Sequence, residues 1–461
     1  MKFDRRAARA SAGATARGWC ATALIAAAGL MGARACRADE PLHLTLESAR
    51  ALALQNSPAL QAAGYSARAA GRVVVENQAA YLPQLSAAAT SVRVDGADSQ
   101  VDRNGVQQQL SSYITAGALN TSTLFNRTAA GVQLTQLVTD FGKTGSLVKG
   151  AKASYRAAQQ NADAVRASVI LDVTEAFYQT LQTQITVQIA QKALDDRQTE
   201  VDRVTVLAKN KLKSELDVSF ANVALAQTQL LLLQARNSFA ASTAQLAYTI
   251  GLNAANPRQF DVQEGSQATE PPPPDLSALL DQASHSRPEL ERQRAVVDAE
   301  HSNVSAQRAS SYPTLSLLGA AGNTFSGDAH LPDKYAAVGL NVSVPLFAGG
   351  RFRAQTAEAR YRERTAQQQL QVLEDGVDRD VRVAWLNARA GFEALSASEK
   401  LRNYAAKALD LAQSRFALGI NTIIELDTAQ LNALDAEIQN VKARYEYKID
   451  LARLSFQVGS L

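Results

Sequence analysis

Cysteine, histidine and aromatic residues are all scarce in this chain. The 461 residues include two cysteines, four histidines and 6% aromatic residues. Both cysteines, Cys20 and Cys36, lie in the first 38 residues, where a basic start, a short apolar run and small residues predict a secretory signal peptide. The mature chain therefore has no thiol for a disulfide, a zinc site or nucleophilic chemistry.

The sequence allows more than one cleavage site for the signal peptide. We expect cleavage after Ala38, with Ala35 as the alternative. Lipidation of Cys36 is less favoured, because Arg34 stands where the lipidation motif takes a small uncharged residue. The pair Arg5-Arg6 indicates twin-arginine export as a minor alternative, since apolar residues do not follow it closely.

Charge and motif content exclude several functions. Residues 1–38 hold seven Lys or Arg and one Asp or Glu, which leaves 40 and 43 in the mature chain, a net charge of −3. No basic patch argues for nucleic acid as a partner. The sequence shows no phosphate loop, no nucleophile elbow and no paired-carboxylate pocket, so we expect no enzyme and no cofactor. The histidines have no metal-ligand spacing; they are His43, His285, His301 and His330.

The chain is an internal duplication. Residues 132–143 match residues 340–351 without a gap at an offset of 208, and an offset of 230 pairs residues 58–60 with 288–290. Repeats of this kind decide the architecture. We expect a first repeat over 39–256, a proline-rich linker over 257–275 and a second repeat over 276–461.

Each repeat contains two predicted strands. In the second repeat apolar residues alternate from Val338 to Leu346, which is typical of a strand with two unlike faces. We expect the strands within 84–139 and within 314–347, with 22 additional residues between the strands of the first repeat. Amphipathic segments at 42–54 and 276–284 and helices that begin at Pro58 and Pro288 precede them.

Long helical hairpins follow the strands, over 143–250 and 351–458. A single helix over 143–210 would be about 100 Å long, too long for the core of a compact domain. The apolar spacing of the last helix is that of a coiled coil. We expect residues 230–233 to be buried against a partner rather than to span a membrane, because the run is too short.

Four strands are too few to close a barrel, which needs about eight. Open edges on an exported sheet would pair with other chains. Only closed barrels or helices satisfy the backbone in lipid, so the sequence predicts that several chains share one outer-membrane barrel. The long helices would then extend into the periplasm. The main alternative is a periplasmic coiled-coil adaptor or scaffold, which would have one hairpin flanked by β-domains.

At this point the sequence resembles the TolC-type outer-membrane efflux proteins. The resemblance is carried by the duplication and by Asn56-Ser-Pro-Ala-Leu60, Tyr81-Leu-Pro-Gln-Leu85, Asp140-Phe-Gly-Lys143 and Pro345-Leu-Phe-Ala-Gly-Gly-Arg351. It implies a mainly helical fold with a β-barrel part, in which a homotrimer forms a 12-stranded barrel in outer-membrane lipid above a periplasmic α-helical barrel. It also implies an exit duct for a tripartite efflux pump or a type I secretion system. The partners would be a periplasmic membrane-fusion adaptor and an inner-membrane transporter of RND, ABC or MFS type.

The same resemblance places a periplasmic gate near the hairpin turns. Phe416 stands where the family often has a gate tyrosine, and Asn421 where it can have an arginine. Glu425 falls on an acid of the entrance ring, and Asp217 on the aspartate that receives the gate links. Phe416 has no hydroxyl and Asn421 has no charge, so this chain departs from a tyrosine–arginine lock. A second ring acid corresponds to Thr428, and Asp427 lies one position off.

Electrostatics gives Glu425 a role without the family. Three copies around one axis would attract cations to a narrow opening. The alternative is that Glu425 and Asp217 are solvated or cap nearby helix starts. We expect the adaptor to contact the hairpin turns, where Lys211 replaces the family's glycine; the contact residues are Lys211, Ser214, Gly419 and Thr422.

Overall fold

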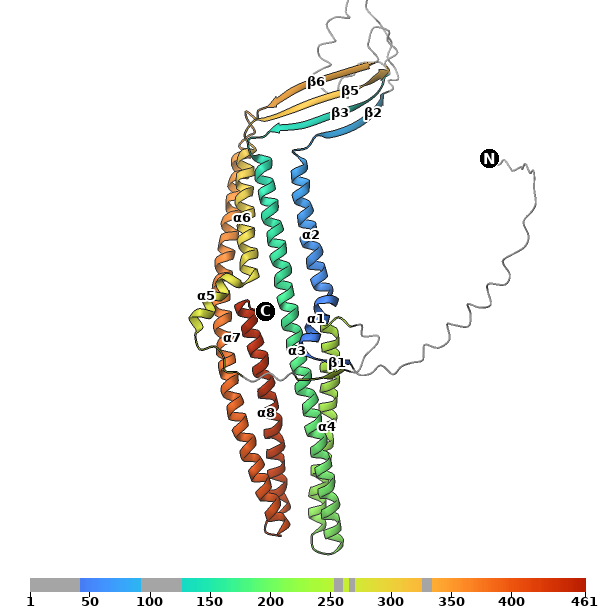
Figure 1. Ribbon diagram of the computed structural model, residues 1–461, viewed down its shortest axis with the longest axis vertical. Coiled ribbons are helices and arrows are strands. Elements are labelled where there is room, and N and C mark those ends of the chain that lie inside the picture. Colours follow the sequence, from blue (N-terminus) through green and yellow to red (C-terminus); the bar gives the residue numbers. More distant parts are fainter. Residues whose placement is uncertain (1–41, 93–126, 253–259, 265–269, 326–333) are drawn as a thin grey trace, which may run out of the picture.

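The computed structural model describes residues 42–92, 127–252, 260–264, 270–325 and 334–461. The molecule is elongated, with a four-stranded sheet at one end and two helical hairpins that turn at the other (Figure 1). The predicted signal peptide, most of the extra segment between the first two strands and part of the linker lie outside the described residues.

Both halves contain the same order of elements. The first half consists of β1 (Leu42–Leu44), α1 (Leu46–Asn56), α2 (Pro58–Ala79), β2 (Gln84–Val92), β3 (Arg127–Thr139), α3 (Lys143–Lys209) and α4 (Glu215–Thr249). The second half consists of β4 (Phe260–Val262), α5 (Leu276–Ser286), α6 (Pro288–Ala309), β5 (Thr314–Phe325), β6 (Lys334–Ser343), α7 (Arg351–Ala417) and α8 (Ile423–Val458). The predicted fold class, long helical hairpins with a β part, is confirmed.

Local sequence explains where the helices begin. The Ser57 side chain caps α2 by accepting from the backbone N–H of Leu60, and Pro58 occupies the first helical position. The 67-residue helices α3 and α7 follow Gly142 and Gly350, whose φ angles of 100° and 82° lie in the left-handed region that favours glycine. These glycines turn the chain from the sheet into the helices.

The sheet is antiparallel, in the order β2-β3-β5-β6. The prediction that the last strand continues to Leu346 is wrong, because β6 ends at Ser343. Ser343 pairs with Thr314, the first residue of β5, so the partner strand ends there. Pro345 could not donate to a ladder in any case.

The amphipathic segment predicted over 42–54 divides into a strand and a helix. Residues Leu42–Leu44 form β1, which pairs in parallel with β4. The helix begins only after Thr45, whose side chain accepts from the backbone N–H of Ser48. Leu44 and Val262 are buried against α3 in the largest apolar cluster, together with Phe177. This belt of short elements lies about halfway along the molecule (Figure 1).

The helices form rows rather than a compact core. Next to the sheet the row runs α2-α3-α6-α7, and towards the hairpin turns it runs α4-α3-α8-α7. Many of the buried contacts are made by alanines, which allow helices to approach closely. Among the described helices, α4 is apolar and long enough to cross a membrane by length and composition alone, and it packs beside α3 as one arm of a hairpin.

Candidate functional site

Two turns close the hairpins at the end farthest from the sheet (Figure 1). Lys211 in the first turn has a φ of 60°, and Gly419 in the second has a φ of 73°. Lys211 therefore adopts the left-handed conformation that favours glycine. The two turns have like geometry although their residues differ.

The predicted acids Asp217 and Glu425 both belong to capping boxes. The backbone N–H of Ser214 donates to Asp217 Oδ2 over 2.9 Å, and that of Thr422 donates to Glu425 Oε2 over 3.2 Å. In return the hydroxyls of Ser214 and Thr422 accept from the backbone N–H groups of the acids. The backbone bond from Ser214 lowers the pKa of Asp217 below its ordinary value. The alternative expectation, that both acids cap helix starts, is confirmed.

Phe416 and Asn421 make other contacts near the same turns. Phe416 is 5% exposed and packs with Val204 and Leu426 between the two hairpins. The Nζ of Lys213 lies 4.4 Å from the centre of its ring, a cation–π contact. Asn421 Oδ1 accepts from Arg415 Nε over 2.8 Å within its own hairpin. In the described part of one protomer, the four predicted gate residues make no hydrogen bond to one another.

Sequence reasoning missed a polar link between the hairpins, centred on Arg197 of α3. Its side chain is 7% exposed, and its Nη2 lies 2.8 Å from Oδ1 of Asp427 on α8. Its Nη1 donates to the side-chain oxygen of Gln430, also on α8. Asp427 is the acid one position away from the expected Thr428, and this offset turns it towards α3. No local pattern marks Arg197, because its partners are more than 200 residues away.

Burial affects a further acid beside this link. Glu200 lies one turn from Arg197, and desolvation raises its pKa against the opposing charges of Arg203, Arg197 and Lys213. Together Arg197, Glu200 and Asp427 make a half-buried charged group close to the hairpin turns. Charges held in this way have few alternative partners if the two hairpins separate.

A second polar cluster joins the linker to α8. Glu264, just after β4, accepts from Lys448 Nζ over 2.6 Å, from the Tyr445 hydroxyl over 2.8 Å and from Arg444 over 3.0 Å. Burial alone would raise the pKa of Glu264, but the bonds from Lys448 and Tyr445 outweigh it and lower the pKa. This cluster holds the described start of the linker against the middle of the molecule.

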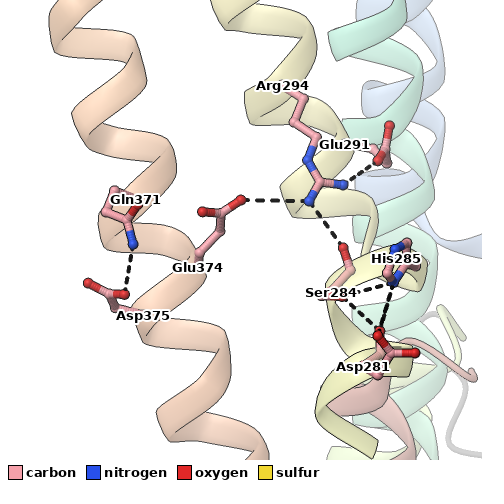
Figure 2. A network of polar contacts seen from close by, with 8 residues as sticks. All are labelled: Asp281, Ser284, His285, Glu291, Arg294, Gln371, Glu374 and Asp375. Carbon is pink, nitrogen blue, oxygen red and sulfur yellow. Dashed lines mark hydrogen bonds and ion pairs between the residues drawn. The ribbon is translucent and has the colours of Figure 1, made fainter. Parts of the chain in front are cut away.

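A third network joins α5 and α6 to α7. Arg294 binds Glu291 over 2.7 Å, the backbone oxygen of Ser284 over 3.2 Å and Glu374 of α7 over 3.6 Å (Figure 2). His285 lies in the same network, where the Ser284 hydroxyl and the Asp281 backbone oxygen both approach its Nδ1. All of these side chains are exposed or half-buried, as expected for a structural joint on the belt.

The ends of the helical rows expose apolar stripes with coiled-coil spacing. On α4, Leu216, Val223 and Leu230 are exposed at steps of seven residues. On α7 and its C-cap, Tyr404, Leu411 and Leu418 follow the same step and are 70%, 63% and 75% exposed. Such stripes are typical of helices that pack against a further helix.

The two faces of the sheet differ in the same way. One face carries exposed apolar side chains, which are Leu85, Val132, Val338, Leu340 and Val342. The opposite face carries mainly small and polar residues, which include Ser86, Thr135, Ser316 and Asn341. A sheet with one apolar and one polar face suits a barrel wall between lipid and water.

Comparison with known proteins agrees with this geometry. A family model described as outer membrane efflux protein matches residues 49–252 and 279–460. The chain is 23% identical over 427 residues to outer membrane protein TolC of Salmonella enteritidis, covering 88% of this chain and 80% of that protein. It is 26% identical over 422 residues to the alkaline protease secretion protein AprF of Pseudomonas aeruginosa, covering 89% and 83%. The crystal structure of the Campylobacter jejuni CmeC outer membrane channel superposes with a TM-score of 0.76 at 16% identity, covering 90% and 85%.

Proposed function

The chain belongs to the outer membrane efflux protein family, and on that basis we propose that three copies form one exit duct served by a periplasmic adaptor and an inner-membrane transporter. The protein is an outer-membrane channel for efflux and secretion, and its long helices extend into the periplasm. The sheet is the part that meets lipid, because its exposed apolar face is the one that an outer-membrane barrel turns outward.

One observation carries the proposal of a closed ring. The sheet, the row of helices next to it and the row near the turns each have an element of the first half at one edge and an element of the second half at the other. The sheet ends on β2 and β6, the upper helices on α2 and α7, and the lower helices on α4 and α7. In Figure 1, α2 and α4 lie on one side of α3 and α7 on the other. A second copy placed beside α7 and β6 would therefore satisfy every row at once, in a head-to-tail contact that closes by rotation.

The number of strands limits how many copies can form the barrel. With four strands per copy, two copies give eight strands and three give twelve. We propose three copies, the number that the resemblance to TolC-type proteins implies, which makes a 12-stranded barrel. The rival reading, an adaptor with a single hairpin, does not fit two hairpins with two strands in each half.

The hairpin turns are the part of the described chain best suited to contact an adaptor. Leu212 is 70% exposed in the first turn, and Leu418 and Ile420 are 75% and 61% exposed in the second. Exposed apolar residues at the tip of a long rod support a contact with another protein. The contact residues that we propose are Lys211, Ser214, Gly419 and Thr422. The relatives TolC and AprF are named for the outer membrane and for protease secretion, which supports efflux and type I secretion as the two settings.

The same end would hold the gate. In a ring, Glu425 and Asp217 of each copy would place like charges around the entrance and favour cations. Phe416 and Asn421 would contribute contacts at the hairpin junction rather than a tyrosine–arginine lock. We assign the closing link within each copy to Arg197 and Asp427, because this half-buried pair joins the two hairpins near their turns.

The family is described as an efflux protein family, and we expect no enzyme activity from this chain. Asp281, Ser284 and His285 are the described group closest to a hydrolase constellation. Both the serine hydroxyl and a backbone oxygen approach the same nitrogen of His285, so the ring does not relay a proton between serine and acid. The three residues instead end α5 beside the Arg294 joint.

The test is single-channel recording of the purified mature protein in a planar bilayer, together with mass measurement in detergent. A trimer with discrete conducting steps supports the duct. A monomer that is soluble without detergent and gives no steps would instead support the adaptor or scaffold.

A further inference from the structure

Tyr335 lies flat across two neighbouring strands on the polar face of the sheet. The register places Ala88, Gly131, Gly322 and Tyr335 side by side on β2, β3, β5 and β6. A Cβ atom added to Gly131 would stand 2.6 Å from the Tyr335 hydroxyl, and one added to Gly322 would stand 2.8 Å from it. The phenol therefore crosses β5 and reaches β3, over two residues that have no side chain.

The close approach of the strands is a second reason why these two positions require glycine. A Cβ atom at Gly322 would also meet the Ala130 backbone oxygen at 2.5 Å, and one at Gly131 would meet the Ala321 backbone oxygen at 2.9 Å. The strands approach closely here, and glycine in a strand interior marks such approaches. The tyrosine covers the gap that the glycines leave.

These four paired residues, from Ala88 to Tyr335, lie on the face that a barrel turns to its interior. The opposite face has Val338 and Leu340 exposed to 82% and 69%, as expected for contact with lipid. Tyr335 is the one aromatic side chain that the register places on the interior face of the described strand residues, and its direct neighbours across the ladder are Gly322, Gly131 and Ala88. The ring is 42% exposed, so one side of it faces the open space.

The geometry points to Tyr335 as the residue that sets the free cross-section of the outer half of the barrel, held flat by Gly131 and Gly322. This inference rests on the proposed trimeric duct, in which three such rings would line one level of the wall. A ring that lies on the wall still occupies part of the passage that an alanine would leave free, and the same ring standing upright would narrow the passage further. Tyr335 is thus a size-determining residue for cargo, and the two glycines are positioning residues.

Residues 39–461 contain no cysteine, so single cysteines introduced there can report access. Gly339 lies on the interior face of β6, about 14 Å from Tyr335 along the strand at about 3.4 Å per residue, and a side chain there meets no atom within 4 Å. Its neighbour Val338 points to the apolar face and is the matched control. The Gly339→Cys and Val338→Cys variants are treated in outer-membrane vesicles with a small charged maleimide and with polyethylene-glycol maleimides of increasing mass.

We expect Gly339→Cys to react with the small reagent and Val338→Cys not to react. In the Gly339→Cys background, adding Tyr335→Ala should raise severalfold the labelling rate of the largest reagent that still reacts. Tyr335→Trp should lower this rate, and Tyr335→Phe should leave it unchanged. The small reagent should label all three Tyr335 variants at the same rate. A general distortion of the barrel would instead change the labelling rate of the small reagent as well. Gly322→Ala should slow the large reagent by lifting the ring, and Gly322→Ala with Tyr335→Ala should restore the rate.

Two results overturn the inference, and they can be told apart. If the large reagents react at the same rate in Tyr335→Ala and Tyr335→Trp, Tyr335 does not set the cross-section, while the duct stands. If Gly339→Cys does not react with the small reagent, the face is not the interior wall, and the proposed arrangement of the barrel fails with it. Because Tyr335→Ala and Tyr335→Trp leave both glycines in place, the test does not depend on whether Gly322→Ala folds.

Discussion

Arg197 on α3 and Asp427 on α8 form an ion pair that joins the two helical hairpins, with Nη2 of Arg197 2.8 Å from Oδ1 of Asp427. Arg197 is almost buried and Asp427 is about one-third exposed. Losing either partner would leave the other charge poorly solvated between two helices. The pair therefore favours the arrangement in which the hairpins lie side by side, close to their turns.

Arg197→Met should increase the open fraction of the channel. The substitution keeps an apolar stem but removes both bonds to α8, so the hairpins separate at lower cost. We expect the mean conductance in planar bilayers to rise severalfold. The matched control is Arg156→Met, because Arg156 forms an ion pair with Asp298 that is about 60% exposed and far from the turns. Equal conductance in wild type and Arg197→Met would contradict a closing role.

Glu264 should make the protein sensitive to acid. Its pKa is lowered in the folded state, whereas in the unfolded chain it would be about 4.3. Its contribution is therefore complete above the unfolded pKa and is lost as the pH falls through the lower, folded pKa. We expect the helical circular dichroism signal to melt at lower temperature as the pH falls below about 4.

Glu264→Gln should remove most of this acid sensitivity. At neutral pH it should cost about 1–3 kcal/mol, because hydrogen bonds from Lys448 and Arg444 lose a charged acceptor. The control is Glu446→Gln, since Glu446 makes only an exposed pair with Lys442. An identical dependence on pH in wild type and Glu264→Gln would show that Glu264 is not responsible.

Leu411→Glu should prevent assembly. Leu411 is 63% exposed in one copy and lies in the apolar stripe of α7, which we place against α4 of the next copy. A charge in a helix seam that excludes water is strongly unfavourable. We expect mass measurement in detergent to find monomer where wild type gives trimer. Glu399→Lys, another charge change at an exposed position of α7, should still assemble. A trimer of Leu411→Glu would place the interface elsewhere.

Features set by nearby residues could be predicted from the sequence. The Ser57 cap, Pro58 at the first turn and the glycines before the long helices act within a few residues, and the helix bounds agree to within a few positions. The duplication supplied the order of the elements.

Features set by distant partners could not be predicted. β1 is a strand only because β4, more than 200 residues later, pairs with it, and β6 ends at Ser343 because β5 ends opposite. The Arg197–Asp427 pair depends in the same way on the register between two hairpins. The gate near the turns stays a prediction from the resemblance, in which Phe416 and Asn421 stand at lock positions without the hydroxyl and the charge that a lock needs.

Glu425 completes the capping box of α8, and in the proposed duct it would also line the entrance; two substitutions should separate these roles. Its carboxylate accepts from the backbone N–H of Thr422, and the Thr422 hydroxyl accepts from the backbone N–H of Glu425. Thr422→Ala removes the hydroxyl but keeps the carboxylate, so it should cost about 1 kcal/mol of stability and leave ion selectivity unchanged. Glu425→Gln keeps a side chain that can still complete the capping box, so it should cost less stability but weaken the preference for cations.

The measurement is the reversal potential across a bilayer with a salt gradient, together with thermal melting of each variant. Thr422→Ala should change mainly the melting temperature and Glu425→Gln mainly the reversal potential, so each variant serves as the control for the other. A reversal potential that moves in Thr422→Ala and not in Glu425→Gln would mean that the shape of the turn, rather than the charge of Glu425, sets selectivity. If neither variant moves it, Glu425 would be a helix cap alone, and the acidic entrance would have to be formed by other residues near the turns.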